Sequence, residues 1–523
     1  MMADLPVTSL LDRGRVYLGH RIRPGCRFFA FDNEEPVVAD RHLTAFRTTK
    51  HLGEQSGTWQ VTVATKPLLH DHLRAFEVVP WHERVAPGDW ALLDASDGTA
   101  EWPIMLGIVD RVHRSKKGPV TTYTISGRDH GKVFDSEIVI LPQYVSDRAI
   151  DLTKATGPFY RGLDAILQES GRDGLSPAEL IERLALFFLG SVTRGTSGAA
   201  PIFHTPRSLR LQSSTGFVDL EAAGLPVELG LPIGELLAFA MDKTTTGRAV
   251  LRELFEGLPD SVRLWDYLSS WANTEMNELY VDFLPRRVLA GGVPKADDYS
   301  YTNKAGQHPF LPAVVLRRRP FPQGAQASSL VFGFGADPVE PPGAPLWRAL
   351  PSTTVDEAQL VTDETSRADA DRFNLYLATP HSSYGASKWT LALGAAGRGR
   401  LPIITDDSAP RYGWRSRFMS SQFLPTDPRV PNATYYRWSR MLADWNERNP
   451  EHWTGDLEHS VMLPGVRVGE RLNVRRDQGT RTESYYLEGV THAWQSIGQA
   501  KATSSSSFVV TRGSEDELGG WRP

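Results

Sequence analysis

The stretch from Trp59 to Ile140 reads Trp59-Gln-Val-Thr-Val-Ala64, Phe76-Glu-Val-Val-Pro80, Trp102-Pro-Ile-Met-Leu-Gly-Ile-Val-Asp110 and Thr121-Thr-Tyr-Thr-Ile-Ser-Gly-Arg-Asp-His130 in its apolar segments. Polar and apolar residues alternate in these segments, and turn signals recur roughly every ten residues. Two of the turns are Ala86-Pro-Gly-Asp-Trp90 and Ser115-Lys-Lys-Gly118. This pattern is typical of a small antiparallel β-barrel. The stretch contains no catalytic motif, so a structural role is expected before an enzymatic one.

The composition is that of an ordinary globular protein with many turns. The chain has 523 residues, of which 41% are apolar and 23% are charged. This length exceeds one typical hydrophobic core, so several domains are expected. The 45 Gly and 36 Pro suit a β-rich chain, and the 14 Trp favour sheet faces and large subunit contacts.

The charge balance argues against a protein that grips nucleic acid. The formal net charge is -5 and the sequence pI is about 6.3, whereas such proteins usually have a basic face and a high pI. Local basic clusters occur at Arg317-Arg318-Arg319 and between Arg471 and Arg476. Both clusters are interpreted as solvated charge in loops or at strand ends.

The number of cysteines and the first residues predict folding in the cytoplasm. Cys26 is the only cysteine, so no intrachain disulfide can form, which fits folding in a reducing cytoplasm. The segment Met1-Met-Ala-Asp-Leu-Pro6 lacks a basic region followed by an apolar one, so no signal peptide is expected. The longest apolar runs, such as Leu184 to Leu189, are too short to span a bilayer.

The pattern predicts a mainly β protein with α+β insertions, in which two antiparallel β-barrels flank a helix-containing middle region. The expected parts are an N-terminal extension over 1–55, a first barrel over 56–150, a mixed helical and β insertion over 151–310, a second β-rich block with a barrel over 311–513, and a C-terminal tail over 514–523. Both blocks contain a Gly followed by an acid before a strand, at Gly88-Asp89 and Gly469-Glu470. This arrangement permits an ancient duplication.

Helical spacing of apolar residues predicts several helices. Ser176-Pro177-Ala178-Glu179 is a good helix start, and that helix would end near Gly190. Further helices are expected over 159–169, 233–258, 262–273 and 432–449. In the last one, one face is formed by Tyr435, Trp438, Leu442 and Trp445.

No catalytic, cofactor-binding or metal-binding residues are predicted. His82-Glu83 lacks the second His of a His-Glu-x-x-His motif, and no Gly-x-Ser-x-Gly elbow or Walker A loop occurs. His70 and His72 could share one strand face as metal ligands, but a loop or edge is favoured. Cys26 is interpreted as a buried thiol.

Ser126-Gly127-Arg128-Asp129 is interpreted as a strand end that is closed by a Gly turn. Arg128 and Asp129 are expected to form a local ion pair there.

Motifs dispersed along the chain resemble, in order, those of phage baseplate hub proteins. They are Gly88-Asp89, Gly107-Ile-Val-Asp110, Ile125-Ser-Gly-Arg-Asp129, the helix-then-strand segment Leu264 to Asp282, Ala313-Val-Val-Leu-Arg-Arg-Arg-Pro-Phe321, Asp371-Arg-Phe-Asn374, Tyr412-Gly-Trp-Arg415, Pro464-Gly-Val-Arg-Val-Gly-Glu470, Tyr486-Leu-Glu-Gly-Val-Thr-His492 and Thr511-Arg-Gly513. The resemblance covers residues 56–513. Residues 1–55 and 191–232 have no counterpart in it.

The resemblance implies a structural protein of the virion, in the tail baseplate, that is assembled in the host cytoplasm. It implies two tube-type barrels per chain and a homotrimeric ring that joins a sixfold tail tube to a threefold central spike. Three two-barrel chains present six barrels, which matches both symmetries. The implied partners are the tail tube protein, the central spike protein, the tape measure protein and other baseplate proteins. DNA would cross the lumen without specific binding during genome ejection, which a mildly acidic chain suits.

Two other functions stay open at this point. A tail-associated cell-wall hydrolase would need a clustered acid pair or a metal triad, and neither is visible as a motif. A peripheral receptor- or glycan-binding tail module would stack exposed Trp on sugars, for which Trp389, Trp414 and Trp494 are candidates. Core or interface positions are favoured for these three residues.

Overall fold

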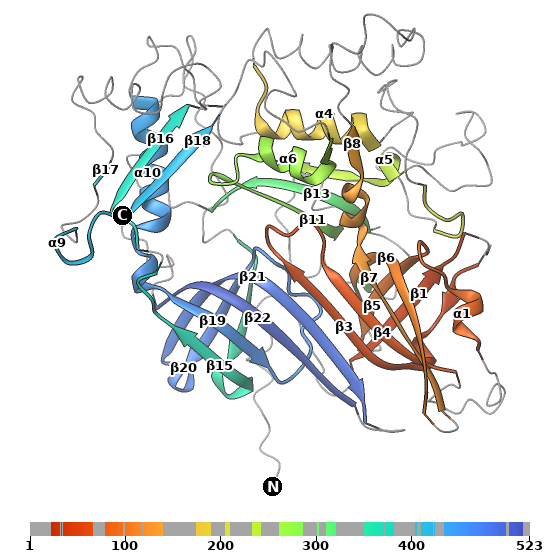
Figure 1. Ribbon diagram of the computed structural model, residues 1–523. Helices are drawn as coiled ribbons and strands as arrows, with labels where there is room; N and C mark the ends of the chain where they lie inside the picture. The colour runs from red at the N-terminus through yellow and green to blue at the C-terminus, as the bar shows by residue number, and fades with distance from the viewer. Residues whose placement is uncertain are drawn as a thin grey trace, which may run out of the picture.

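The computed structural model describes residues 22–31, 33, 35–65, 79–97, 100–117, 120–139, 174–189, 204–209, 233–241, 261–285, 301–302, 310–320, 350–370, 372–380, 403–404, 409–421, 423, 433–497 and 502–515. Its dominant feature is one large, mainly antiparallel sheet, with helices above it in the view of Figure 1. The prediction of a mainly β fold with helix-containing insertions is confirmed.

The large sheet contains 14 of the described strands along the path β15-β19-β22-β21-β3-β4-β7-β6-β5-β1-β2, to which β12, β14 and β20 are attached. The predicted two barrels are therefore two halves of one continuous sheet. The short strands β2 (Val37–Val38) and β12 (Tyr301–Thr302) pair with β1 and β6.

The first sheet unit has the strand order β3-β4-β7-β6-β5-β1, and all its neighbours are antiparallel. Its strands are β1 (Arg23–Phe29), β3 (Leu43–His51), β4 (Thr58–Ala64), β5 (Trp90–Ser96), β6 (Ala100–Lys117) and β7 (Val120–Asp129). The expected boundary at residue 55 separates β3 from β4, which form a hairpin. The unit thus starts upstream of the expected boundary, because β1 and β3 of the supposed extension supply two of its strands.

The second sheet unit has the strand order β15-β19-β22-β21-β20-β14, which matches the first unit position by position. Its strands are β14 (Ser352–Asp356), β15 (Leu360–Ser366), β19 (Trp453–His459), β20 (Arg471–Arg476), β21 (Arg481–Ser496) and β22 (Ala502–Ser514). The pairings from β15 to β20 are antiparallel, as in the first unit. The last pairing differs, since β14 runs parallel to β20 whereas β1 runs antiparallel to β5.

Local details of the backbone repeat as well. In the first unit the 3₁₀ turn η3 (Asp40–His42) leads into β3, and in the second unit the 3₁₀ turn η9 (Glu357–Gln359) leads into β15. Both strands have a bulge after their first residue. Bulges also lie between Val109 and Arg111 in β6 and between Leu487 and Gly489 in β21. Bulges at equivalent positions are specific features of a fold, so the two units share register as well as strand order.

The turn before β5 and β20 has the same hydrogen bonds in both units. The Gly88 amide donates to the Val109 carbonyl (2.9 Å), and the Gly469 amide donates to the Leu487 carbonyl (2.7 Å). Both glycines have positive φ, +99° and +74°, which L side chains rarely adopt. The Gly-acid pairs that the sequence singled out therefore occupy equivalent positions.

The middle region packs helices on a three-stranded sheet of order β11-β13-β9. It contains α4 (Pro177–Leu189), α5 (Ile233–Leu236), α6 (Leu264–Ala272), β9 (Ala238–Met241), β11 (Asn277–Pro285) and β13 (Phe310–Arg318), together with the short pair β8 (Glu137–Val139) and β10 (Ser261–Arg263). The helix predicted over 262–273 is confirmed as α6. Figure 1 shows α4 and α6 on one side of the sheet formed by β11 and β13.

Two helix predictions in this region have different outcomes. The predicted start at Ser176 is confirmed, because Ser176 Oγ accepts from the Glu179 amide (3.3 Å) and Glu179 Oε2 accepts from the Ser176 amide (2.8 Å). The helix expected over 233–258 is wrong in part, since Ala238–Met241 forms β9. That segment pairs in parallel with β13, and this tertiary pairing outweighs its helix propensity.

A third element, α10 (Ala433–Asn446), packs on a small sheet of order β17-β16-β18. Its strands are β16 (Leu375–Pro380), β17 (Ile403–Ile404) and β18 (Ser416–Ser421). On α10, Trp438, Leu442 and Trp445 are buried as predicted. The Tyr435 side chain and the helix expected over 159–169 lie outside the described residues.

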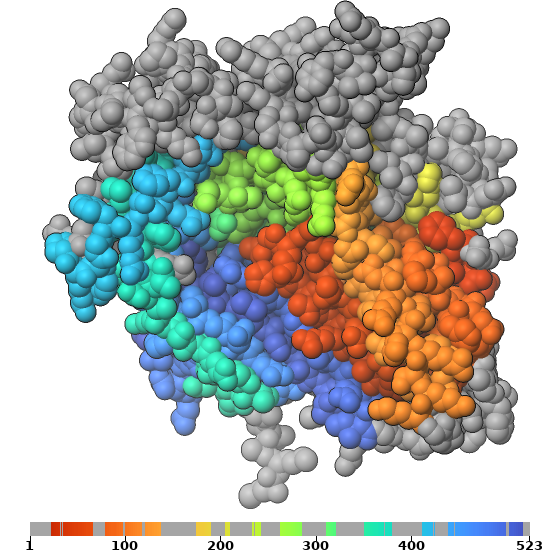
Figure 2. Space-filling model, viewed as in Figure 1, coloured from red at the N-terminus to blue at the C-terminus, as the bar shows by residue number. Residues whose placement is uncertain are grey.

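The two sheet units share one hydrophobic core. A single cluster of buried side chains includes Phe46 and Val61 of the first unit and Leu457 and Phe508 of the second. A second cluster joins the middle helices to α10. Figure 2 shows the first unit, in red and orange, directly against the second unit, in blue. The two units are therefore packed as one body.

Candidate functional site at the junction of the two sheet units

Strand β21 joins the two units. The first part of this long strand pairs with β20, and its second part pairs antiparallel with β3, from Gly489 opposite His51 to Gln495 opposite Ala45. The hydroxyls of Thr491 and Thr49 lie 3.1 Å apart across this pairing. A row of main-chain hydrogen bonds between distant parts of the chain fixes the angle between the units.

A buried carboxylate, Asp129, lies beside this strand junction. It accepts hydrogen bonds from the amides of Gly57 (2.9 Å) and Gly131 (2.9 Å), and it is paired with the Lys50 ammonium. Only 2% of Asp129 is exposed, so these partners offset the cost of burying its charge. Asp129 at the end of β7 is thereby tied to β3.

The expected ion pair between Arg128 and Asp129 is wrong. Arg128 Nε lies 3.0 Å from Asp110 Oδ2, and its guanidinium also pairs with Asp135. Successive side chains of a strand point to opposite faces of the sheet, so neighbours in sequence face different partners. Arg128 faces the outer side, whereas Asp129 faces the junction.

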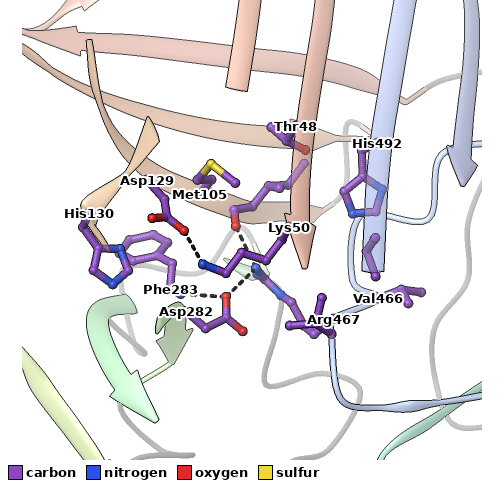
Figure 3. A pocket seen from close by; sticks show the side chains of 13 residues that line it. Thr48, Lys50, Met105, Asp129, His130, Asp282, Phe283, Val466, Arg467 and His492 are labelled. Atoms are coloured by element: carbon purple, nitrogen blue, oxygen red, sulfur yellow. Dashed lines mark hydrogen bonds and ion pairs between the residues drawn. The ribbon is translucent and has the colours of Figure 1, made fainter. Parts of the chain in front are cut away.

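Arg467 connects three parts of the chain. Its guanidinium donates to the Ile104 carbonyl (2.7 Å) and to the Pro103 carbonyl, both in β6 of the first unit. Its Nη1 lies 3.5 Å from Asp282 Oδ1, on β11 of the middle region. Figure 3 shows Arg467 bonded to Asp282, next to the pair of Lys50 and Asp129. A loop of the second unit is thus bonded to the first unit and to the middle region.

Two buried histidines line the same space and are neutral. Burial and the charge of Arg467 lower the pKa of His492 to about 3, and His492 Nδ1 lies 2.8 Å from Ser506 Oγ. Burial also lowers the pKa of His130. A neutral imidazole adds no further positive charge beside Arg467 and Lys50, whose charges are balanced by Asp282 and Asp129.

The cavity between these side chains has a volume of about 30 Å³. A water molecule needs roughly 10–15 Å³ measured in this way, so the space can hold water but no substrate-sized molecule. Its charged groups pair around it, Lys50 with Asp129 and Arg467 with Asp282. The arrangement is that of a structural contact, in which paired charges hold three parts of the chain together.

A second buried cluster joins the middle region to the second unit. Arg317 Nε lies 2.9 Å from Glu278 Oε2, and Arg317 Nη2 donates to the Gly469 carbonyl (2.8 Å). The Tyr486 hydroxyl donates to Glu278 Oε1 (2.6 Å), and burial followed by the charge of Glu278 raises the pKa of Tyr486 well above its usual value. A Cβ atom on Gly469 would lie 2.1 Å from Arg317 Nη2, so the site requires glycine there.

The interpretation of the basic clusters as solvated charge is therefore wrong. Besides Arg317, Arg318 is only 7% exposed, and Arg319 donates to the Thr274 carbonyl (3.1 and 3.0 Å). Each of these three arginines reaches an acceptor or the interior, because tertiary packing that the linear sequence does not show surrounds the end of β13.

The same correction applies to the cluster from Arg471 to Arg476. Arg471 and Arg476 are each 7% exposed. Arg476 Nε lies 2.8 Å from Glu483 Oε2, and its guanidinium also pairs with Asp363 of β15. Arg476 ties neighbouring strands of the second unit together, and neither arginine faces outward as expected.

The other residues singled out in the sequence are dispersed. Cys26 is buried in β1, and burial raises the pKa of its thiol. His82 is exposed at one end of the first unit, where its Nδ1 lies 2.8 Å from the Tyr123 hydroxyl. Trp414 is 63% exposed, and Trp494 packs against the shared core. His70, His72 and Trp389 lie outside the described residues.

The described residues contain no group of three or more His, Cys, Asp or Glu side chains placed to hold a metal ion. None of their helices is long and apolar enough to cross a membrane.

Sequence reasoning missed the junction residues Lys50, Asp282 and Arg467 as a site. One signal was present, since Arg467 stands between two valines in the loop motif that begins at Pro464, and a charge between apolar residues implies a buried partner. Its partners are more than 180 residues away in sequence, so their identity depended on the fold.

No protein-family model and no curated protein sequence matches the chain. Solved structures do match it. A tail protein from Neisseria meningitidis has 11% identity and a TM-score of 0.43, with 94% of this chain and 96% of that chain covered. The 43 kDa tail protein of prophage MuSo2 from Shewanella oneidensis has 11% identity and a TM-score of 0.40, with 93% and 98% covered.

A third match is a Francisella PdpA–VgrG complex, with 8% identity, a TM-score of 0.34, and 99% of this chain and 56% of that chain covered. These three matches are to two tail proteins and to a PdpA–VgrG complex. At these identities and TM-scores the likeness assigns no function to this chain. The evidence for its function is the internal repeat of strand order.

Proposed function

We propose that the chain is a structural hub of a phage tail or a related contractile injection machine. Three copies form a ring that adapts a sixfold tail tube to a threefold central spike. The observation that carries this proposal is the repeat of strand order and bulge positions in the two sheet units. Two equivalent units per chain let three chains present six similar surfaces to one partner and a threefold surface to another.

The junction supports this role physically. An adaptor needs a fixed angle between its two units, because an error in that angle accumulates around a ring. The β21–β3 pairing, the bonds of Arg467 and the pair of Lys50 and Asp129 hold the units at one angle. Buried charge pairs of this kind specify geometry more than they add stability.

The proposal assigns no catalytic role to the chain. This absence of a catalytic role is supported by the charged junction residues, which pair with one another around a cavity that holds no more than water. The proposed partners are the tail tube protein, the central spike protein, the tape measure protein and other baseplate proteins. DNA would cross a lumen whose lining is neutral or acidic on balance, because each Lys or Arg that meets a phosphate adds salt-sensitive affinity.

The decisive experiment measures copy number and position. Native mass spectrometry of the purified full-length chain should give a trimer, and electron microscopy of the particle should place that trimer on the tail axis between tube and spike. Six copies per ring, or a peripheral position, would overturn the hub. A peptidoglycan zymogram should show no clear zone, and a zone abolished by one Asp or Glu substitution would favour a hydrolase.

A further inference from the structure

Each strand of the intramolecular junction has a counterpart elsewhere in the sheet whose matching edge pairs with no described strand. In the second unit, the C-terminal part of β21 is covered by β3 of the first unit. The equivalent part of β6, residues 111–117, pairs with β7 on one edge, and no described strand pairs with its other edge. The equivalent of β3 is β15, which pairs with β19 alone among the described strands.

Four matched positions define how these two free edges correspond to the observed junction. On the long strands, the residue before the bulge is Val109 in β6 and Leu487 in β21. On the partner strands, it is Leu360 in β15 and Leu43 in β3. Counting from these positions transfers the β21–β3 register to the free edges without further assumption.

We propose that the free edge of β6 in one copy pairs antiparallel with the free edge of β15 in a second copy. The transferred register places Lys116 opposite Asp363, as Trp494 lies opposite Phe46. It places Ser115 opposite Glu364, in the same way as Ala493 lies opposite Arg47. The inference deepens the proposed hub function and rests on it, because it names the contact that would close the ring.

The charges of the two edges are complementary. The free part of β6 carries the basic side chains Arg111, His113, Arg114, Lys116 and Lys117 and no acid. The strand β15 carries Glu364 and also Asp363, which already pairs with Arg476 of the same chain, and it carries no base. Opposite charges across or diagonal to one another stabilise a strand pair, whereas two like-charged edges would repel. The opposite signs therefore favour pairing of unlike edges and oppose pairing of either edge with itself.

Exposure at these edges also indicates a partner. Val361 on β15 is 68% exposed. An exposed β-branched apolar side chain on an open edge strand favours pairing of that edge with another chain. Arg111, Arg114, Lys116 and Lys117 are exposed at the other edge. Natural proteins cover or blunt such edges, and a second copy covers both of these at once.

The positions of the two edges suit a closed ring. Figure 1 shows β15 at the lower left of the sheet and the long hairpin of β6 and β7 at its lower right. Because the contact joins two different surfaces, it is a head-to-tail contact, which closes only when the rotation per copy divides a full turn. Within each chain the β21–β3 junction turns from one unit to the next. If that turn is one sixth of a full rotation, repeating it between chains closes a ring of three copies with six equivalent junctions.

The test is register-specific cross-linking of the full-length chain. Ser115→Cys combined with Glu364→Cys should give covalent trimers on a non-reducing gel, because directly opposite residues of paired strands lie within disulfide range. The native Cys26 is buried and does not interfere. The matched control combines Ser115→Cys with Val361→Cys, which is three residues away, about 10 Å, and should give no cross-link.

The outcomes separate this inference from the proposed function. A trimer by mass that gives no covalent product with the Ser115 and Glu364 pair would overturn the edge pairing and leave the hub standing. A full-length chain that stays monomeric in solution and is absent from the tail axis would overturn the hub, and the inference with it. Equal cross-linking of the control pair would refute the register.

Charge exchange gives a second readout. Lys116→Glu with Lys117→Glu should weaken trimer formation about tenfold, and the added change Glu364→Lys should restore part of it. Arg84→Glu, an exposed substitution on the short helix α1 (Trp81–Arg84) away from both edges, should leave the trimer unchanged. An unchanged trimer in the double variant would contradict the contribution of charge to this edge.

Discussion

At the scale of single residues, buried charge is the distinctive feature of this protein. Arg317, Arg467 and Arg476 lie in the interior or at its margin, and each bonds to groups from another part of the chain. A buried arginine with fork-like donors can satisfy several carbonyls and carboxylates at once. These residues thus fix how the parts of the chain are oriented.

Removing the Arg467 guanidinium should destabilise the protein strongly. Arg467→Met keeps the apolar stem but leaves the Asp282 carboxylate without its cationic partner and two β6 carbonyls without their donor, which is expected to cost about 3–5 kcal/mol. Arg467→Lys should cost less, since an ammonium still pairs with Asp282. Urea unfolding measures both, with the exposed Arg47→Met as a control that should change stability by less than about 0.5 kcal/mol. A loss equal to that of the control would contradict the role of Arg467.

Asp94 should make stability fall as pH rises. Burial, opposed by Arg27 and aided by Asp40 and Glu101, raises the pKa of Asp94 to about 7 from 3.8. The unfolded chain therefore loses this proton at lower pH than the folded one. The contribution is fully present below about pH 4 and is lost as pH rises through 7, by up to about 1.4 kcal/mol per pH unit.

The measurement is the free energy of unfolding of Asp94→Asn relative to the unsubstituted protein between pH 4 and 8. As pH rises, the free energy of unfolding of Asp94→Asn should increase relative to that of the unsubstituted protein, because asparagine does not ionise. Thr58→Ser, an exposed substitution that adds or removes no ionisable group, is the control and should show a flat difference. A pH-independent difference for Asp94→Asn would refute the raised pKa.

At the scale of elements, capping and bulges decide where strands and helices begin. Helix α4 starts at a reciprocal pair of hydrogen bonds between Ser176 and Glu179. Ser176→Ala removes one of these and should cost about 1 kcal/mol, whereas Ser176→Asp should keep most of the stability because Asp is also a good cap. Chemical denaturation of both variants tests this, and an equal loss in both would show that packing at Ser176, rather than its cap, matters.

At the scale of the whole molecule, the shared core predicts that the two sheet units unfold together. One buried cluster and the β21–β3 pairing span both units. Scanning calorimetry of the full-length chain should therefore show these units in a single transition, and a fragment of residues 22–139 should not fold cooperatively. Two separate transitions, each reproduced by its own fragment, would mean that the units are independent domains.

The sequence by itself determined the class of fold and much of its local structure. The period of two in β4 to β7, the Ser-Pro start of α4 and the apolar face of α10 are local patterns, so residues close in sequence carry them. The Gly-acid pairs before β5 and β20 even marked equivalent turns of the two units. These features rest on backbone and capping chemistry that acts within a few residues.

Only the tertiary structure decided how the units join and which charges pair. Arg128 bonds to Asp110 and Asp135 rather than to its neighbour Asp129, and β9 is a strand because β13 lies beside it. The first unit begins at β1 because β5 pairs with it. Strand pairing and burial of charge depend on partners that are distant in the chain, and a linear pattern does not specify which distant partner is chosen.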